Sequence, residues 1–314
     1  MGLIDKASRR IPGSWLAVAA YARSRSIFIR RCTDPLADLL RFRDLTIRTG
    51  PAAGLLFNTG GSYLNYLAGG EYAEEADVQV ALAALLAPGM VFYDIGANLG
   101  IYTIMAARLV GPLGDVVSFE PVPRNLDIVQ HNSRANRFSN VTVLPYALGA
   151  TDGRARFLVS ARHDWGMLSN SEQRPNAYTG EITVDVRGLD SLLDRHELKP
   201  PEVAKMDIEG GEVAALAGAD NLLATHRPIL VIELHETAEA VAGVLARHDY
   251  KCSLFGSRVP MEQVSGNFHA VAIPSERENC LKLLEHFRDP GFPRCDRCRA
   301  DVRPFQGRVL YHVN

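Results

Sequence analysis

Five carboxylates and one histidine stand at or near the ends of apolar segments that have the composition of β-strands. They are Asp94, Glu120, Asp207, Glu209, Glu233 and His235. Open parallel sheets bind their ligands at the carboxyl ends of the strands, so side chains at these positions are candidates for one site. Carboxylates there can accept hydrogen bonds from hydroxyl groups or hold a metal ion, and a histidine can accept a proton.

The first of these acids leads into a glycine-spaced turn. Residues 92–100 read FYDIGANLG, an apolar segment followed by an acid and a turn. The turn contains Gly96, Asn98 and Gly100. Glycines at such a position let the backbone come close to a ligand, and the helix that follows begins beside it. The pattern predicts that this turn binds a cofactor.

A second acid, and the absence of two phosphate-binding patterns, indicate which cofactor the turn binds. Glu120 follows the apolar segment Val116–Phe119, where an acid can accept hydrogen bonds from a ribose diol. The turn lacks the third glycine of the dinucleotide pattern G-x-G-x-x-G, and it lacks the lysine and hydroxyl of a P-loop. We therefore predict a nucleoside without phosphates, S-adenosylmethionine. Glu120 would bind its ribose, and Asp94 would order the turn and meet the amino group of the methionine moiety.

Each prediction has a simpler alternative. Asp94 could cap the following helix, and Glu120 could be a surface acid; their spacing after two apolar segments favours the cofactor site. A nicotinamide-dependent oxidoreductase would share the fold, but the missing third glycine disfavours it. A non-catalytic cofactor-binding protein is the other alternative. It is disfavoured because it has no reason to keep several costly acids in one cleft.

Those acids form the second group. Asp207 and Glu209 follow one apolar segment, and Glu233 and His235 end the next. Residues two apart in an extended chain point to the same side, so the two pairs face one cleft if their strands are neighbours. Buried carboxylates need a cation, a proton or hydrogen bonds. Two interpretations stay open: a divalent metal such as Mg²⁺ held by Asp207 and Glu233, or a base network in which His235 takes the proton. Glu209 could instead cap the next helix.

The elements that must position these residues alternate regularly. The sequence predicts helices over Glu74–Leu86, Ile101–Leu109, Pro123–Asn136, Glu212–Leu223 and Thr237–Arg247. It predicts strands over Val91–Ile95, Val116–Phe119, Val141–Leu144, Val203–Asp207 and Pro228–Leu234, with Tyr250–Phe255 and His269–Ile273 as a closing antiparallel pair. Such alternation is typical of an α/β protein with a mostly parallel sheet and helices on both faces. Two further β segments, Ala155–Val159 and Glu181–Val186, flank a polar loop with His163, Asp164 and Trp165 that is a candidate lid.

The composition of the chain limits the classes of partner and the cellular compartment that we expect. The 314 residues are 47% hydrophobic and carry a net charge of −2, without a basic stripe, so we expect no nucleic-acid partner. No apolar run approaches the roughly 18 residues of a membrane span. Five scattered cysteines fit a reducing compartment, so we expect a cytoplasmic protein. Cys295 and Cys298 form a C-x-x-C, which is weak evidence for zinc because a structural site needs four ligands; Cys280, His286 and His312 could complete it.

Several ordered blocks together resemble one known family. They read YAEE at 72–75, FYDIGANLGIYT at 92–103, FEPVPRN at 119–125, KMDIEGGE at 205–212, LAGA at 216–219 and RPILVIELH at 227–235. This set is similar to the FkbM family of S-adenosylmethionine-dependent methyltransferases, over about residues 70–275. The resemblance implies a seven-stranded Rossmann-like fold and, usually, O-methylation of sugars, glycans or macrolide-type natural products.

The resemblance also implies roles for individual residues. The positions that match the cofactor motifs are Asp94, Gly96, Asn98, Gly100 and Glu120. Asp207, Glu209 and Glu233 match the downstream signature. We expect an N-terminal, partly helical extension over 1–70, a methyltransferase domain over 71–275, and a basic C-terminal extension over 276–314. The expected partner is a small-molecule or glycan acceptor, and the sequence does not decide whether the protein is a homo-oligomer.

Overall fold

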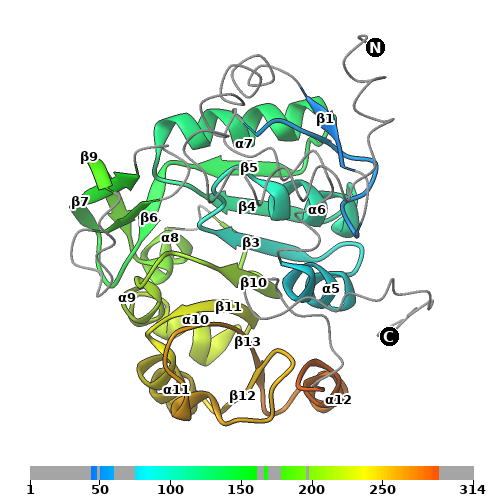
Figure 1. The fold of residues 1–314 in the computed structure, drawn as a ribbon, viewed down its shortest axis with the longest axis vertical. Helices are drawn as coiled ribbons and strands as arrows, with labels where there is room; N and C mark the ends of the chain where they lie inside the picture. Colours follow the sequence, from blue (N-terminus) through cyan, green and yellow to red (C-terminus); the bar gives the residue numbers. More distant parts are fainter. Residues whose placement is uncertain are drawn as a thin grey trace, which may run out of the picture.

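A computed structural model describes residues 44–47, 50–59, 75–160, 166–168, 178–195 and 198–289 (Figure 1). Its centre is a seven-stranded sheet in the order β12-β13-β11-β10-β3-β4-β5. The strands are β3 (Val91–Ile95), β4 (Asp115–Phe119), β5 (Val141–Leu144), β10 (Val203–Met206), β11 (Ile229–His235), β12 (Tyr250–Leu254) and β13 (Asn267–Pro274). β13 runs antiparallel to β11 and β12, whereas β5, β4, β3, β10 and β11 are parallel. The predicted Rossmann-like sheet and its antiparallel closing pair are confirmed.

Helices cover both faces of this sheet. The described helices are α5 (Ala76–Leu85), α6 (Ile101–Val110), α7 (Pro123–Ala135), α8 (Leu189–Asp194), α9 (Glu212–Ala217), α10 (Asp220–Thr225), α11 (Ala238–Arg247) and α12 (Glu278–Phe287), with a short η2 (Met261–Gln263). Apolar residues of α5, α6 and α12 pack with Phe92 in one core, and those of α8 to α11 pack with Tyr93 in the other. Neighbouring residues of β3 enter opposite cores because side chains alternate along a strand. The strand therefore has no solvent-exposed face.

The chain changes direction across the sheet between β3 and β10. After β3 it adds β4 and β5 on one side, and it then returns to place β10 on the other side of β3. The carboxyl ends of β3, β4 and β10 therefore meet around the point where open α/β sheets bind ligands.

One predicted helix is wrong in its extent. The segment Glu212–Leu223 forms two helices, α9 and α10, separated at Gly218. A Cβ at Gly218 would lie 2.1 Å from the carbonyl oxygen of Gly149, so this backbone packs directly against a distant loop. The break follows from that tertiary contact, and helical periodicity carries no sign of it.

A second, four-stranded sheet lies beside the main one, at the edge near α8 (Figure 1). It contains β6 (Tyr146–Leu148), β7 (Gly153–Ser160), β8 (Gly166–Leu168) and β9 (Tyr178–Arg187), in the order β6-β9-β7-β8. The two predicted β segments are part of β7 and β9, whereas β6 and β8 were not predicted. His163, Asp164 and Trp165 lie outside the described residues, so their role as a lid stays a prediction.

The described part of residues 1–70 is a short hairpin, β1 (Leu45–Thr46) with β2 (Leu56–Phe57). It packs on α7, where the Asn136 side chain accepts a hydrogen bond from the Leu56 amide at 2.8 Å and donates one to the Leu56 carbonyl at 2.7 Å. The predicted helical part of this segment lies outside the described residues, as do Cys295, Cys298 and His312 of the zinc hypothesis. Within the described part of the chain, no helix has the length and apolar character needed to cross a membrane.

Candidate active site

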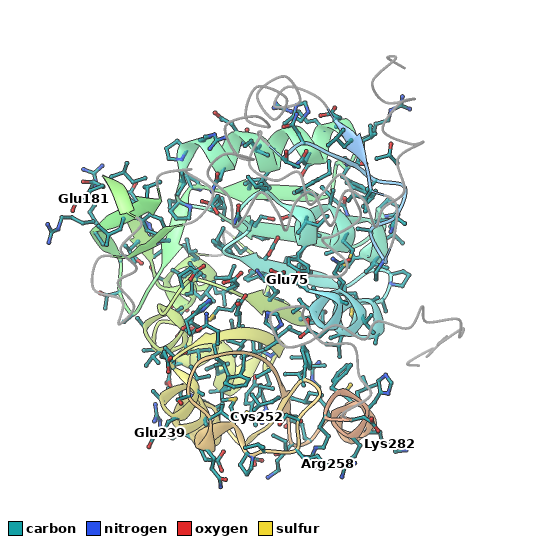
Figure 2. The ribbon with its side chains drawn as sticks, viewed as in Figure 1. Glu75, Glu181, Glu239, Cys252, Arg258 and Lys282 are labelled. Atoms are coloured by element: carbon teal, nitrogen blue, oxygen red, sulfur yellow. The ribbon has the colours of Figure 1, made fainter. Side chains whose placement is uncertain are left out.

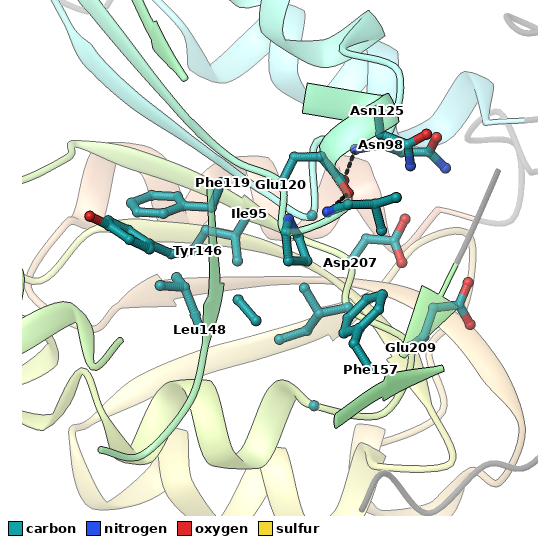
Figure 3. Close-up of a pocket in the computed structure, with 16 residues that line it drawn as sticks. Ile95, Asn98, Phe119, Glu120, Asn125, Tyr146, Leu148, Phe157, Asp207 and Glu209 are labelled. Carbon is teal, nitrogen blue, oxygen red and sulfur yellow. Dashed lines mark hydrogen bonds between the residues drawn. The ribbon is translucent and has the colours of Figure 1, made fainter. Parts of the chain in front are cut away.

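A pocket of about 640 Å³, part of it open to solvent, lies at the carboxyl ends of β3, β4 and β10. Its walls are formed by Ile95, Gly96, Asn98, Phe119, Glu120, Pro121, Val122, Asn125, Tyr146, Ala147, Leu148, Phe157, Asp207, Ile208, Glu209 and Gly211. Figure 3 shows that Phe119, Tyr146 and Leu148 lie at one end, Asp207 and Glu209 at the other, and Glu120 between them. The pocket therefore has an apolar end, an acidic end and one carboxylate in the middle.

The glycine turn forms one wall because its backbone is tightly folded. Gly96 has φ of +80°, and a Cβ there would lie 1.8 Å from the carbonyl oxygen of Asp207. Gly100 also has a positive φ, and a Cβ there would lie 3.0 Å from the Val129 side chain. These glycines bring the turn close to the end of β10 on one side and to α7 on the other. The sequence predicted that they let the backbone approach a ligand, whereas the close contacts in the structure are with neighbouring protein atoms.

Glu120 occupies the position predicted for a ribose-binding acid. It is buried, and its two oxygens accept hydrogen bonds from the Asn98 amide at 2.8 Å and the Val122 amide at 2.9 Å. Burial raises the pKa of Glu120 to about 8, although these hydrogen bonds oppose the rise. The Asn125 side chain also donates a hydrogen bond to Glu120. A carboxylate has about four lone-pair sites, so these three donors leave room for a hydroxyl group of a ligand.

Asp94 lies elsewhere than expected. It is fully buried and is not part of the pocket lining. One of its oxygens accepts a hydrogen bond from the Thr103 hydroxyl at 2.6 Å, and the other has no hydrogen-bond partner among the described residues. Burial raises the pKa of Asp94, and the charge of Lys205 opposes that rise. This geometry ties Asp94 to the first turn of α6 and places it behind the pocket wall. Gly100 is likewise outside the lining.

The four predicted catalytic residues do come together, because β10 and β11 are neighbours. His235 Nε2 lies 3.4 Å from Glu209, 3.5 Å from Glu233 and 3.8 Å from Asp207. Its side chain is only 2% exposed, whereas those of Asp207 and Glu209 are 23% and 28% exposed. The carboxylates can therefore meet a ligand in the pocket, and His235 lies behind them.

A carboxylate that was not predicted, Glu212, fixes the ring of His235. Its Oε1 lies 3.1 Å from His235 Nδ1, and its Oε2 accepts a hydrogen bond from the Thr237 hydroxyl at 2.9 Å. Burial opposes a charge on His235, but the hydrogen bonds to Glu212 and Glu233 and the nearby acids outweigh it and raise its pKa to about 11. His235 therefore carries a proton at neutral pH unless a metal ion replaces that proton.

A buried lysine, also not predicted, balances part of the acidic charge. Lys205 is 4% exposed, and its Nζ lies 3.2 Å from Asp207 Oδ2 and 4.9 Å from the centroid of the Tyr102 ring. Glu75, a half-buried residue just before α5 (labelled in Figure 2), accepts a hydrogen bond from the Tyr102 hydroxyl. The sequence does contain a signal for the pair of Lys205 and Asp207, a lysine within the apolar strand at 203–206. Lysine is almost never fully buried without a partner, so its position predicts a buried acid nearby.

Asp207, Glu233 and His235 also suit a cation. Each offers one ligand atom, and these three atoms lie within 4.8 Å of one another. Glu212 holds the other ring nitrogen of His235, which is how metal-binding histidines are usually oriented. Oxygen and imidazole ligands together are compatible with a divalent ion.

Comparison with known proteins identifies the family. Residues 94–255 match the family model described as the methyltransferase FkbM domain, and the chain belongs to this family of methyltransferases. It is 29% identical over 146 residues to the hexuronic acid methyltransferase AglP of Haloferax volcanii, a match that covers 46% of this chain and 56% of that protein. It is 26% identical over 144 residues to Methyltransferase 1 of Beauveria bassiana, covering 41% of this chain and 57% of that one. The chain thus spans little more than half the length of these relatives.

Among solved structures, the chain is similar to the methyltransferase FkbM from Methylobacillus flagellatus. The TM-score is 0.42 and the sequence identity 21%, and the match covers 78% of this chain and 59% of that one. The predicted family resemblance is confirmed by the family match.

Proposed function

We propose that this methyltransferase transfers the methyl group of S-adenosylmethionine to a hydroxyl of a sugar, a glycan or another natural product. The observation that carries the proposal is the chemistry of the pocket wall. Among the described residues it contains three carboxylates, Glu120, Asp207 and Glu209, and no lysine or arginine. A wall without a cation does not favour a polyphosphate, and the charged acids on it attract a ligand that carries a sulfonium and an ammonium group.

The shape of the pocket supports the same ligand. Its apolar end, with Phe119, Tyr146 and Leu148, suits a purine base, and Glu120 in the middle suits a ribose diol (Figure 3). The side-chain oxygens of Asn98 and Asn125 are buried and have no hydrogen-bond partner in the part of the chain that the structure describes, and both residues line the pocket. A buried acceptor without a partner costs roughly 1–3 kcal/mol, so hydrogen-bond donors of a bound nucleoside would relieve that cost.

In the reaction, the carbon–sulfur bond of the sulfonium breaks as a bond forms between the methyl carbon and the acceptor oxygen. The acceptor hydroxyl loses its proton, and the cofactor leaves as a neutral thioether. The protein must align the two reactants, exclude water and receive the proton. Because Asp207 and Glu209 reach the pocket and His235 does not, we assign the first contact with the hydroxyl to the carboxylates. His235 already carries a proton, so it holds these carboxylates in place, with Glu233 and Glu212, and is not itself the base.

A divalent cation such as Mg²⁺ is the second part of the proposal. Asp207, Glu233 and His235 would hold it, and it would make the acceptor hydroxyl more acidic. We expect Mn²⁺ to bind the purified protein with a single site in calorimetry, and Asp207→Asn to weaken that binding by about 10-fold or more. Glu239→Gln, an exposed acid, serves as the control. If Mn²⁺ binds no better to the native protein than to Asp207→Asn, the cluster works without a metal.

The main test of the function is cofactor binding followed by transfer. Calorimetry should show binding of S-adenosylmethionine and of its demethylated product, and Glu120→Ala should abolish both. Labelled methyl transfer is then measured against sugars, glycans and a metabolite extract, with and without chelator. A folded protein that binds a nicotinamide dinucleotide but neither sulfur nucleoside would replace this proposal with the oxidoreductase alternative. Binding without transfer to any acceptor would favour a non-catalytic role.

A further inference from the structure

A buried row of alternating carboxylates and imidazoles leads from α5 to the acidic cluster. Asp77 Oδ2 lies 2.7 Å from His269 Nδ1, and His269 Nε2 lies 3.3 Å from Glu233 Oε2. The other oxygen of Glu233, Oε1, lies 3.5 Å from His235 Nε2. Each oxygen of Glu233 thus faces a different histidine.

The positions of these residues are set by the fold and not by chance surface contacts. Glu233 and His269 are directly opposite each other on the neighbouring strands β11 and β13. The side chains of Asp77, His269 and Glu233 are 6%, 7% and 12% exposed. The ring of His269 also lies edge-on to Phe255, with 6.5 Å between centroids. The ring of His269 is therefore held by Asp77 and Glu233 at its two nitrogens and by the aromatic ring of Phe255.

Asp77 has a local role that does not account for this contact. It stands in the first turn of α5, and its Oδ1 accepts a hydrogen bond from the Val78 amide at 2.9 Å. An acid there stabilises the helix whether or not a histidine is present. Its second oxygen is directed at His269 in the interior, however, where a buried ionic pair is often no more stable than apolar residues of similar size. A role at the reaction centre explains why the pair is there.

We propose that Asp77 and His269 form a positioning dyad for Glu233, an inference that rests on the proposed function. His269 holds Glu233 Oε2, and this contact turns Oε1 toward His235 and the site shared with Asp207. Asp77 holds the other nitrogen of His269 and fixes the plane of its ring. Without the dyad, the Glu233 carboxylate can rotate away from the site. The dyad does not touch the pocket, so the affinity for the cofactor should not depend on it.

Two substitutions of His269 separate positioning from general damage. In His269→Gln the amide nitrogen takes the place of Nε2 and still reaches Glu233. In His269→Asn it takes the place of Nδ1 and reaches only Asp77. We expect His269→Asn to lower kcat by about 10–100-fold, the usual effect of removing a partner of an active-site ligand, and His269→Gln to keep most of it. The dissociation constant of S-adenosylhomocysteine should be unchanged in both variants.

A double-mutant cycle with Glu233→Gln decides whether His269 acts through Glu233. In that background His269→Asn should cost little further activity, because the group that it positions is already impaired. If the losses of kcat in His269→Asn and Glu233→Gln multiply in the double variant, His269 acts independently of Glu233 and the proposal is wrong. Equal losses of kcat in His269→Asn and His269→Gln would also contradict it.

A readout without an acceptor keeps this test separate from the proposed function. The ring nitrogen resonances of His235 report on Glu233, so in nuclear magnetic resonance spectra His269→Asn should shift them and His269→Gln should not. Equal shifts in the two variants would again overturn the dyad. If the native protein neither binds S-adenosylhomocysteine nor transfers a methyl group, the proposed function fails, and these spectra still decide the positioning.

Discussion

The proposed binding role of Glu120 can be tested through the protonation of its carboxyl group. Burial raises its pKa to about 8 in the free protein, so much of it is protonated at neutral pH. Hydroxyl groups that donate to Glu120 favour its charged form. Cofactor binding should therefore release a proton below about pH 8, and the affinity should rise by up to about tenfold per pH unit as the pH increases toward that value and level off above it.

Calorimetry with S-adenosylhomocysteine in buffers of different ionisation enthalpy measures this proton release. In Glu120→Gln the affinity should be lower and should no longer depend on pH, while Glu239→Gln at the molecular surface (Figure 2) should behave as the native protein does. An identical pH dependence in native protein and Glu120→Gln would show that another group is responsible.

At the scale of elements, the turn after β3 requires glycine at position 96 for two reasons: its φ is positive, and its backbone packs directly against the Asp207 carbonyl. Gly96 and Gly89 both have positive φ, of +80° and +89°, but a Cβ at Gly89 would meet no atom within 4 Å. Alanine at either position should cost about 1–2 kcal/mol from backbone strain alone. Gly96→Ala should cost more, because its Cβ would overlap the Asp207 carbonyl and push the turn away from β10.

Urea unfolding of the two variants measures this difference, and calorimetry measures its effect on the cofactor. Gly96→Ala should lose S-adenosylhomocysteine binding under conditions where it is still folded, whereas Gly89→Ala should bind normally. Equal losses of stability with normal binding in both variants would mean that the close approach to Asp207 has no effect on the site.

At the scale of the whole molecule, the hairpin of β1 and β2 is joined to the main sheet region by side chains of α7 and of its C-cap, Asn136. Asn136 binds both backbone groups of Leu56, as a neighbouring strand would. Asn132, one helical turn earlier, binds the Asn58 amide at 2.7 Å and the Leu99 carbonyl at 2.8 Å, so it links the hairpin to the glycine turn. The described part of the N-terminal segment is thus built into the molecule beside the glycine turn.

Asn136→Ala should loosen the hairpin without unfolding the sheet. It leaves two backbone groups of Leu56 without partners, which costs roughly 1–3 kcal/mol. Amide hydrogen exchange should accelerate at residues 55–58 and stay unchanged in β3 and β10. Asn221→Ala, an exposed asparagine, is the control. Uniform acceleration across the central sheet would instead mean that the hairpin and the domain unfold as one unit.

Much of the fold and part of the site could be predicted because the signals are local. The strands Val91–Ile95 and Val141–Leu144 have the predicted bounds, since short apolar runs between turn residues specify strands directly. Convergence of Glu233 and His235 with Asp207 followed from the two-residue repeat of a strand and from the adjacency of β10 and β11. The prediction that Asp94 meets the ligand does not match its position, because its side chain is buried and outside the pocket lining. Side chains alternate between the two faces of β3, and the packing of helices on each face decides which of them reach the pocket.

The amino-acid sequence by itself determined the types of the elements, their order and the carboxylates at the strand ends, because these follow from periodicity and composition within short segments. Only the tertiary structure decided which of those groups touch. His269 and Asp77 are 192 residues apart and meet through the pairing of β13 with β11 and the packing of α5. Contacts of that kind depend on strand order and on which face a helix covers, and no local pattern encodes either.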